Sequence, residues 1–212
     1  MRIFFVWRDC WHLLVGGLVV VVFGLLMGLL ELAWLGMVWI VAVVLFFRDF
    51  ERQVVQDERA VLAPADGKVV AIVEEQEPNF LKGPARRVSI FLSIFDVHVQ
   101  RSPLASRVEW CHYTPGKFHT AWKEEASIEN ERNGVGFRRG AVNILVYQVA
   151  GLIARRIVNW VKPGDEVGAG QRFGLIKFGS RVDVFMPLSV NVSVKVGDRV
   201  RGGLDVLGSL AS

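Results

Sequence analysis

The sequence predicts a mainly β protein, folded as a flattened barrel or sandwich, behind an N-terminal transmembrane helical hairpin. The first observation is that residues 13–47 are almost all uncharged and apolar. The second is that stretches rich in valine and isoleucine recur from Val61 onward about every 8–12 residues, with turn residues between them. The third is a ten-residue segment near the C-terminus that occurs twice. The 212 residues suffice for one ordinary domain and such an appendage.

The hairpin is predicted from two runs without charge, Leu13–Leu30 and Leu32–Phe47, which Glu31 separates. A bilayer core about 30 Å thick needs roughly 20 helical residues to cross it. The 35 positions from Leu13 to Phe47 are too many for one span and slightly few for two. A tight hairpin that turns near Glu31 fits best, and one long tilted helix is the alternative. Arginines lie on both sides of the run, so the positive-inside rule places the following domain in the cytoplasm, at the inner membrane.

The charge and the cysteines exclude several classes of protein. The net charge is +4, but the basic residues are scattered and no nucleic-acid-binding module is present. Attraction to an anionic lipid surface is therefore the better interpretation, and we expect no nucleic-acid partner. The two cysteines, Cys10 and Cys111, make neither a disulfide framework nor a zinc signature. We expect no metal site.

The β-rich domain is expected to follow the hairpin directly, with residues 1–48 as the hairpin and residues 49–212 as the domain. A charged connector leads to strand-like segments, each bounded by turn residues such as Pro-Ala-Asp-Gly and Ser-Pro. The segment at 121–134 is polar, with helical spacing or a long loop. The strand-like segments are residues 61–75, 86–103, 107–118 and 137–161.

The internal repeat indicates how the C-terminal part folds. Val161–Gly170 reads VKPGDEVGAG and Val194–Gly203 reads VKVGDRVRGG, 33 residues further on. Gly-Asp followed by valine is typical of a tight turn that opens a strand. Two such half-units facing each other would form a flattened barrel like the lipoyl and biotinyl carrier domains. We therefore expect a lipoyl-like C-terminal half, with residues 178–183 between the two half-units.

One strand-like stretch contains an unusual pair. Residues 175–187 read LIKFGSRVDVFMP, with Gly179 and Ser180 in the middle of apolar and β-branched residues. Glycine weakens a strand and usually marks a bend, a bulge or a close backbone approach. The pair is therefore either a simple kink or a place where the backbone itself takes part in chemistry.

Several separated motifs, in this order, resemble phosphatidylserine decarboxylase in its short, membrane-anchored form, over essentially the whole chain. Besides the stretch with Gly179 and Ser180, the resemblance rests on four further segments. They are FFRDFER at 46–52, PADGKV at 64–69, SIFDVHVQRSP at 93–103 and NERN at 130–133.

The resemblance implies a proenzyme that processes itself. The Ser180 hydroxyl would attack the carbonyl of Gly179, and the chain would split into a β chain, residues 1–179, and an α chain, residues 180–212. Ser180 would become a covalent pyruvoyl cofactor, whose ketone forms a Schiff base with the amino group of phosphatidylserine. The products would be phosphatidylethanolamine and carbon dioxide. The implied partner is phosphatidylserine in an anionic membrane, and the oligomeric state stays open.

The resemblance also implies catalytic roles for Asp66, as a charge-relay aspartate, and for Asp96 and His98, as an Asp-x-His pair. The match departs from the family at Arg101, where longer members carry a second histidine, and after Ser180, where Arg181 replaces threonine. Either His98 serves both as the base for self-cleavage and as the proton donor after decarboxylation, or another group shares these steps. Arg101 is a candidate for binding the substrate carboxylate or phosphate.

Two alternatives compete with this interpretation. Leu207-Gly208-Ser209 also reads Leu-Gly-Ser, but a cut there leaves four residues, too few to hold a catalytic group. A non-enzymatic, membrane-anchored adaptor with a lipoyl-like domain would share the architecture. Such adaptors carry a long helical hairpin between the lipoyl halves, for which the residues between Gly170 and Val194 leave no room. The adaptor predicts an uncut chain.

Overall fold

The computed structural model describes residues 3–54, 57–116, 130–151, 156–177 and 180–210. The chain divides into two compact units, Met1–Glu51 and Arg52–Ser212. Each unit has its own secondary structure and packing, and each is considered separately.

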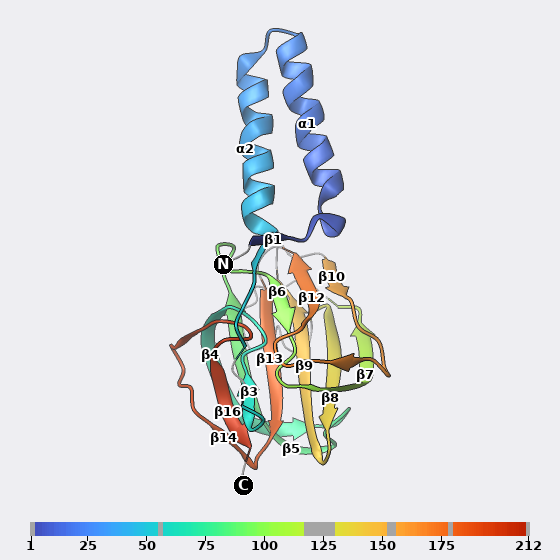
Figure 1. Cartoon of the computed structure of the whole chain (residues 1–212), viewed down its shortest axis with the longest axis vertical. Coiled ribbons are helices and arrows are strands. Elements are labelled where there is room, and N and C mark those ends of the chain that lie inside the picture. Colours follow the sequence, from blue (N-terminus) through green and yellow to red (C-terminus); the bar gives the residue numbers. More distant parts are fainter. Residues whose placement is uncertain (1–2, 55–56, 117–129, 152–155, 178–179, 211–212) are drawn as a thin grey trace. The chain divides into compact units, whose positions relative to one another are not determined.

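The first unit is a helical hairpin closed by a short pair of strands (Figure 1). Its helices meet at close range because glycines lie between them: a Cβ added at Gly24 would lie 2.6 Å from the backbone nitrogen of Ala33, and one at Gly36 would lie 2.9 Å from the carbonyl oxygen of Gly17. Gly28, with a φ of +70°, allows the reversal between the helices. The elements are β1 (Ile3–Phe5), the 3₁₀ helix η1 (Trp7–Asp9), α1 (Trp11–Leu26), α2 (Leu30–Phe46) and β2 (Arg48–Phe50).

The prediction that this hairpin crosses a membrane is wrong. Helix α1 has 16 residues and α2 has 17. At a rise of 1.5 Å per residue each is about 24–26 Å long, short of the roughly 30 Å that a bilayer core requires. Within the described ranges, no helix is long and apolar enough to span a membrane. The uncharged run is shared between two helices and the turn that joins them.

The second unit is built on an eight-stranded antiparallel sheet with the strand order β11-β7-β8-β9-β13-β5-β4-β15. Two three-stranded sheets, β10-β12-β6 and β14-β16-β3, accompany it. The strands of the large sheet are β4 (Gly67–Glu77), β5 (Gly83–Leu92), β7 (Ser106–Thr114), β8 (Arg132–Arg139), β9 (Val142–Ala150), β11 (Glu166–Val167), β13 (Ser180–Pro187) and β15 (Arg199–Val200). Those of the smaller sheets are β3 (Ala60–Leu62), β6 (Val99–Arg101), β10 (Arg156–Asn159), β12 (Arg172–Lys177), β14 (Val190–Val192) and β16 (Val206–Leu210).

Strand β13 is one of the two middle strands of this sheet, between β9 and β5 (Figure 1). Its two faces have different surroundings. Successive side chains of a strand point to opposite faces. Val182, Val184 and Met186 are fully buried and belong to the main apolar core. The alternate residues begin with Arg181 and Asp183, which are also buried. The strand therefore carries an apolar face and a charged face, both shielded from water.

The two copies of the repeat form matching turns at the two edges of the sheet. In the first copy the amide of Lys162 donates to Asp165, and in the second the amide of Lys195 donates to Asp198. The first turn leads into β11 and the second into β15, which are the two edge strands. The copies meet at their last glycines, because a Cβ at Gly203 would lie 3.4 Å from the Cα of Gly170. The sheet is curled so that its edges approach each other.

The prediction of a separate lipoyl-like C-terminal half, which was made from this repeat, is wrong. Strand β13 pairs with β5 on one side and β9 on the other, so the C-terminal part is inserted among earlier strands. Each copy of the repeat forms a turn that leads into one edge strand of a single continuous sheet. The predicted fold class is corrected to a mainly β unit with one curled eight-stranded sheet, without a transmembrane hairpin.

Replacing Gly24 by alanine should destabilise the hairpin by about 1–3 kcal/mol, because the new Cβ collides with the backbone of the facing helix. Gly16→Ala is the matched control, since nothing lies within 4 Å of a Cβ there. It should stabilise α1 by up to about 1 kcal/mol through helix propensity. Amide hydrogen exchange of the full chain, followed by mass spectrometry, measures both effects. Equal protection in the two variants would contradict the close helix contact.

Candidate active site

Ser180 is the first residue of β13 and is completely buried. It pairs with Leu92 of β5 and with Ala150 of β9. Among the described residues its hydroxyl has no hydrogen-bond partner. A buried hydroxyl without a partner costs about 1–3 kcal/mol and is unusual enough to indicate a functional role. Gly179, predicted to precede the scission, lies outside the described residues.

The strand register brings the segment with Asp96 and His98 to the same end of the sheet. Leu92, opposite Ser180, is the last residue of β5, and a tight turn at Ser93–Asp96 follows it. The amide of Asp96 donates to the carbonyl of Ser93 at 3.0 Å. Behind this turn, the carbonyl of His98 accepts a 3.3 Å hydrogen bond from the amide of Ile176, near the end of β12. His98 is thus linked by the turn to the end of β5, which pairs with Ser180, and by a hydrogen bond to β12.

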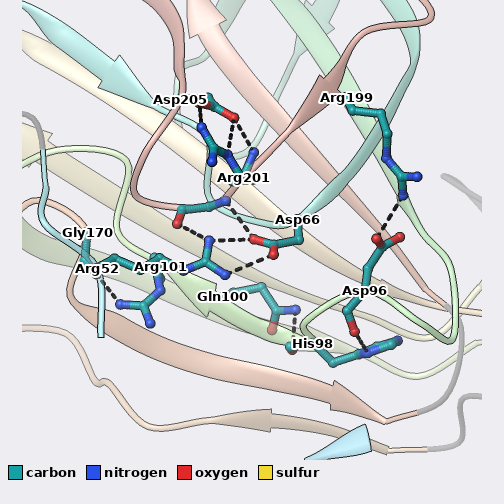
Figure 2. A network of polar contacts seen from close by, with 11 residues as sticks. Arg52, Asp66, Asp96, His98, Gln100, Arg101, Gly170, Arg199, Arg201 and Asp205 are labelled. Atoms are coloured by element: carbon teal, nitrogen blue, oxygen red, sulfur yellow. Dashed lines mark hydrogen bonds and ion pairs between the residues drawn. The ribbon is translucent and has the colours of Figure 1, made fainter. Parts of the chain in front are cut away.

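The environment of His98 determines which ring nitrogen can act as a base. The side chain is fully buried, and Nδ1 lies 2.9 Å from the backbone oxygen of Asp96 (Figure 2). A carbonyl oxygen can only accept, so Nδ1 must carry the proton of the neutral ring. The lone pair is then on Nε2, which makes this nitrogen the basic one.

A chain of buried amides holds the backbone of His98 in place. Gln100 donates to the carbonyl of His98 at 2.7 Å, Gln148 donates to Gln100 at 2.8 Å, and Asn133 donates to Gln148 at 2.9 Å. All four residues are buried. Gly174 leaves room for the chain, because a Cβ there would lie 2.6 Å from Nε2 of Gln148. The amides connect β6, β9 and β8 and restrain the position of the histidine.

Gln100 and Gln148 were missed by the sequence analysis, although each carried a signal. Each is an uncharged polar residue within an apolar strand, in HVQR and VYQVA. Such a residue needs a buried partner, because an unsatisfied amide in a core is costly. The partner could not be named in advance, since the two glutamines are 48 residues apart.

Asp66 is held in an ion pair, away from His98. Its carboxylate accepts from Arg52, with a 2.8 Å bond to Oδ2, and from the amide of Gly202 at 2.8 Å (Figure 2). Arg52 also donates to the carbonyl of Gly202. Within the described ranges Asp66 makes no hydrogen bond to His98. The structure therefore shows Asp66 joining the connector at Arg52 to the second repeat, and its predicted catalytic role stays a prediction.

Asp96 and His98 are brought together, but through the backbone of Asp96. The Asp96 carboxylate accepts from the amide of Ser93 at 2.8 Å and from Arg199 at 2.9 Å. It therefore shapes the turn that positions His98. Arg101 is buried in a neighbouring location, where its guanidinium donates to the carbonyl of Gly170 at 3.0 Å. Its predicted contact with substrate stays a prediction.

Arg181 and Asp183, whose presence in an apolar strand was unexplained, form a buried ion pair. Nη2 of Arg181 donates to Oδ2 of Asp183 at 3.0 Å, and Nε lies 3.0 Å from Oδ1 of the same carboxylate. Arg87 of β5 lies 3.9 Å from the same carboxylate and donates to Glu75 at 2.7 Å. These charges lie on the face of β13 opposite the Ser180 side chain. They are structural partners of the strand that carries Ser180.

The other candidate nucleophiles do not compete. Burial raises the pKa of the Cys111 thiol above its ordinary value, although a hydrogen bond from Asn159 acts in the opposite direction. This thiol therefore stays protonated near neutral pH. Ser209 is an exposed residue inside β16, paired with Asn191. The glycine before it is explained by packing, since a Cβ at Gly208 would lie 2.6 Å from the Asn191 oxygen.

A metal site is not formed by the described residues, which contain no group of three or more His, Cys, Asp or Glu side chains arranged to hold an ion. The polar groups around Ser180 and His98 are instead a hydroxyl, an imidazole and amides. Such a set can transfer protons and polarise a carbonyl group.

Comparison with known proteins identifies a family. The model of the phosphatidylserine decarboxylase family matches residues 39–208. The phosphatidylserine decarboxylase proenzyme of Carboxydothermus hydrogenoformans is 45% identical over 204 residues, which cover 94% of this chain and 93% of that protein. The proenzymes of Symbiobacterium thermophilum and Magnetococcus marinus are 49% and 47% identical, over 78% and 84% of this chain and 77% and 85% of those proteins.

Gln148→Ala should lower the free energy of unfolding by about 1–3 kcal/mol, because it removes the acceptor of the Asn133 side-chain amide and the donor to the Gln100 side-chain oxygen. Urea unfolding of the full chain measures the change. Gln76→Ala is the control, since Gln76 is exposed on β4 and its truncation should stay within about 0.5 kcal/mol. Similar losses in both variants would show that the amide chain does not hold the fold around His98.

Proposed function

The chain belongs to the phosphatidylserine decarboxylase family and is a carboxy-lyase, and we propose that it generates its own catalytic group by cutting itself between Gly179 and Ser180. The observation that carries this proposal is the buried Ser180 hydroxyl without a partner among the described residues. The relatives named above are proenzymes, which is consistent with activation by processing. The adaptor alternative has no such support.

The proposed self-cleavage uses groups of this chain alone. The Ser180 oxygen adds to the carbonyl carbon of Gly179, the peptide C–N bond breaks, and an ester replaces the amide. Loss of the Cα proton of Ser180 then breaks the Cβ–O bond and releases the Gly179 carboxylate. Water hydrolyses the remaining dehydroalanine to an N-terminal pyruvoyl group and ammonia. His98 is proposed to accept the hydroxyl proton at Nε2, because Nδ1 is committed to Asp96.

The residues around Ser180 fit such a group. A pyruvoyl group is small and uncharged, and the buried hydroxyl position offers it an environment without strong hydrogen-bond partners among the described residues. The pairing of Ser180 with Leu92 and Ala150 would hold the new N-terminus of the α chain. When present, the group supplies an electron-poor carbonyl that takes up the electrons left by the departing carbon dioxide. His98 is then proposed to hold a proton at Nε2 and return it to the substrate carbon.

We propose that the enzyme works at the surface of an anionic membrane, without crossing it. A diacyl lipid substrate rarely leaves the bilayer, so an enzyme held at the interface meets it far more often. The hairpin exposes large apolar side chains. Among them are Leu26, which is 75% exposed, and Trp34, which is 69% exposed. Burial of such residues in the headgroup region would supply affinity.

Ser180→Ala should abolish self-cleavage, because the only attacking hydroxyl is removed. The intact mass of the purified protein should show one chain of 23.7 kDa. The unmodified protein should give two fragments that meet at residues 179 and 180, the smaller with a blocked N-terminus. Ser209→Ala, the control at the second Gly-Ser pair, should be cut normally. Cleavage of Ser180→Ala, or an uncut parent chain, would refute the self-processing mechanism.

His98→Asn should slow self-cleavage by about 10²–10⁴-fold, the usual contribution of a general base. Asparagine keeps a donor near the Asp96 carbonyl but lacks the basic Nε2. The time course of fragment formation after synthesis in a cell-free system measures the rate. His112→Asn, on the exposed part of β7, is the control and should be cut at the normal rate. An unchanged rate in His98→Asn would assign the base to another residue.

A further inference from the structure

The turn that joins β5, one of the two strands that pair with Ser180, to His98 exposes two large apolar side chains. Ile94 is 51% exposed and Phe95 is 77% exposed. They lie at the tip of the Ser93–Asp96 turn, directly after Leu92, which pairs with Ser180. A single exposed apolar residue is ordinary, but two adjacent ones form a small exposed apolar surface at the end of the sheet that carries the site.

The turn is rigidly built, so the exposure is not the result of a loose loop. The carboxylate of Asp96 accepts from the amide of Ser93 at 2.8 Å, and the hydroxyl of Ser93 accepts from the amide of Phe95 at 3.3 Å. Arg199 fixes Asp96 from the neighbouring turn with a 2.9 Å bond (Figure 2). These contacts fix the turn on which Ile94 and Phe95 are exposed.

The neighbouring turn adds a third apolar residue and positive charge. Val196, 60% exposed, lies in the Lys195–Asp198 turn that precedes Arg199. The side chains of Lys68, Lys195 and Arg199 are exposed nearby, and the register places Arg199 beside Lys68. Asp96 forms an ion pair with Arg199, and Asp198 caps its own turn. The three cations outnumber these two acids, so the surface is an apolar tip with a cationic border.

We propose that this surface, called here the apolar tip (Ile94, Phe95 and Val196 with the Lys68, Lys195 and Arg199 border), enters the headgroup region of an anionic bilayer and aligns the catalytic site with the substrate. The inference rests on the proposed function and adds the part of the catalytic unit that touches the lipid. Apolar side chains penetrate such an interface by about 5–10 Å, and cations favour anionic lipid.

The chain length between the tip and the histidine supports a lipid surface as the partner. His98 is three positions after Phe95, which is at most about 11 Å of extended chain. With Phe95 at the level of the upper acyl chains, His98 would therefore lie near the headgroups, where the carboxylate of phosphatidylserine is found. Three apolar side chains are also a small area for a stable protein interface, which usually buries about 800 Å² per partner.

A fluorescent label at position 95 tests the proposal. The full chain carries Phe95→Cys, with Cys10→Ser and Cys111→Ser, and the single thiol is labelled with an environment-sensitive dye. The protein is added to vesicles of phosphatidylcholine with or without phosphatidylglycerol, an anionic lipid that is not a substrate. Emission at position 95 should shift to shorter wavelength on anionic vesicles and be quenched by lipids with a shallow nitroxide. Leu188→Cys, at the far end of β13, is the matched control and should stay in water.

A second measurement does not depend on the label. Ile94→Asp with Phe95→Asp should reduce partitioning of the full chain to anionic vesicles by about tenfold or more, since two apolar side chains lose their burial. Leu188→Asp should leave it unchanged. Lys195→Gln should reduce only the preference for anionic over neutral vesicles, by a few-fold.

Several outcomes would overturn the inference. They are a chain that does not bind vesicles, a label at position 95 that stays in water while the chain is bound, and a label that is already buried without vesicles. The last result would identify a second copy of the chain or another protein as the partner. None of these readouts requires cleavage or turnover. Failure of the self-processing mechanism would be seen in the intact mass, and failure of the apolar tip in the vesicle data.

Discussion

The pairing of β13 with strands on both sides is the constraint on which the rest of the molecule depends. Ser180 begins this strand, and its neighbours β5 and β9 hydrogen-bond to it from the first residue. A cut directly before Ser180 would leave the C-terminal chain attached by two ladders and by the buried side chains of Val182, Val184 and Met186. Each fully buried side chain of this size contributes roughly 1.5–3 kcal/mol. The fold can therefore lose one peptide bond without losing the strand.

The same strand also needs an unambiguous register, and its charged residues provide it. A slip of one residue would turn every side chain of β13 to the opposite face. Arg181 and Asp183 would then enter the apolar core without Arg87, at a cost of several kcal/mol per buried charge. The ion pair on one face and the apolar residues on the other thus fix the position of Ser180 along the strand. The position of Ser180 is therefore protected against the one-residue slip that would exchange the two faces.

His98 is positioned by a different kind of constraint, a line of amides that crosses three strands. Each member has its hydrogen-bonding groups engaged in a buried environment, where an unsatisfied amide would be costly. The histidine therefore has a defined tautomer and a fixed backbone before any substrate arrives. The turn between Leu92 and His98 then connects this rigid interior to an exposed apolar tip. An enzyme whose substrate stays in a membrane needs catalytic groups that are held rigidly and an exposed surface that reaches the lipid.

The sequence by itself determined the local features. The uncharged runs indicated two helices, and the alternating segments indicated strands. The Gly-Ser pair at 179–180 stood out as unusual, and the resemblance to the family then implied that it is the scission site and named Asp96 and His98. The pair was expected inside one strand, whereas β12 ends at Lys177 and β13 begins at Ser180. The sequence did not predict the lengths of the helices, because a continuous apolar run does not show where the chain will turn. The turn at Met27–Leu29 leaves each helix too short for the predicted membrane span.

Only the tertiary structure decided which distant residues meet. It paired Asp66 with Arg52, linked Gln100 to Gln148, buried Arg101 against Gly170, and set the two repeats on opposite edges of one sheet. Periodicity reports how a residue relates to its neighbours along the chain. The partner across the sheet depends on the register, and the register is set by burying the apolar and ionic faces of all the strands together.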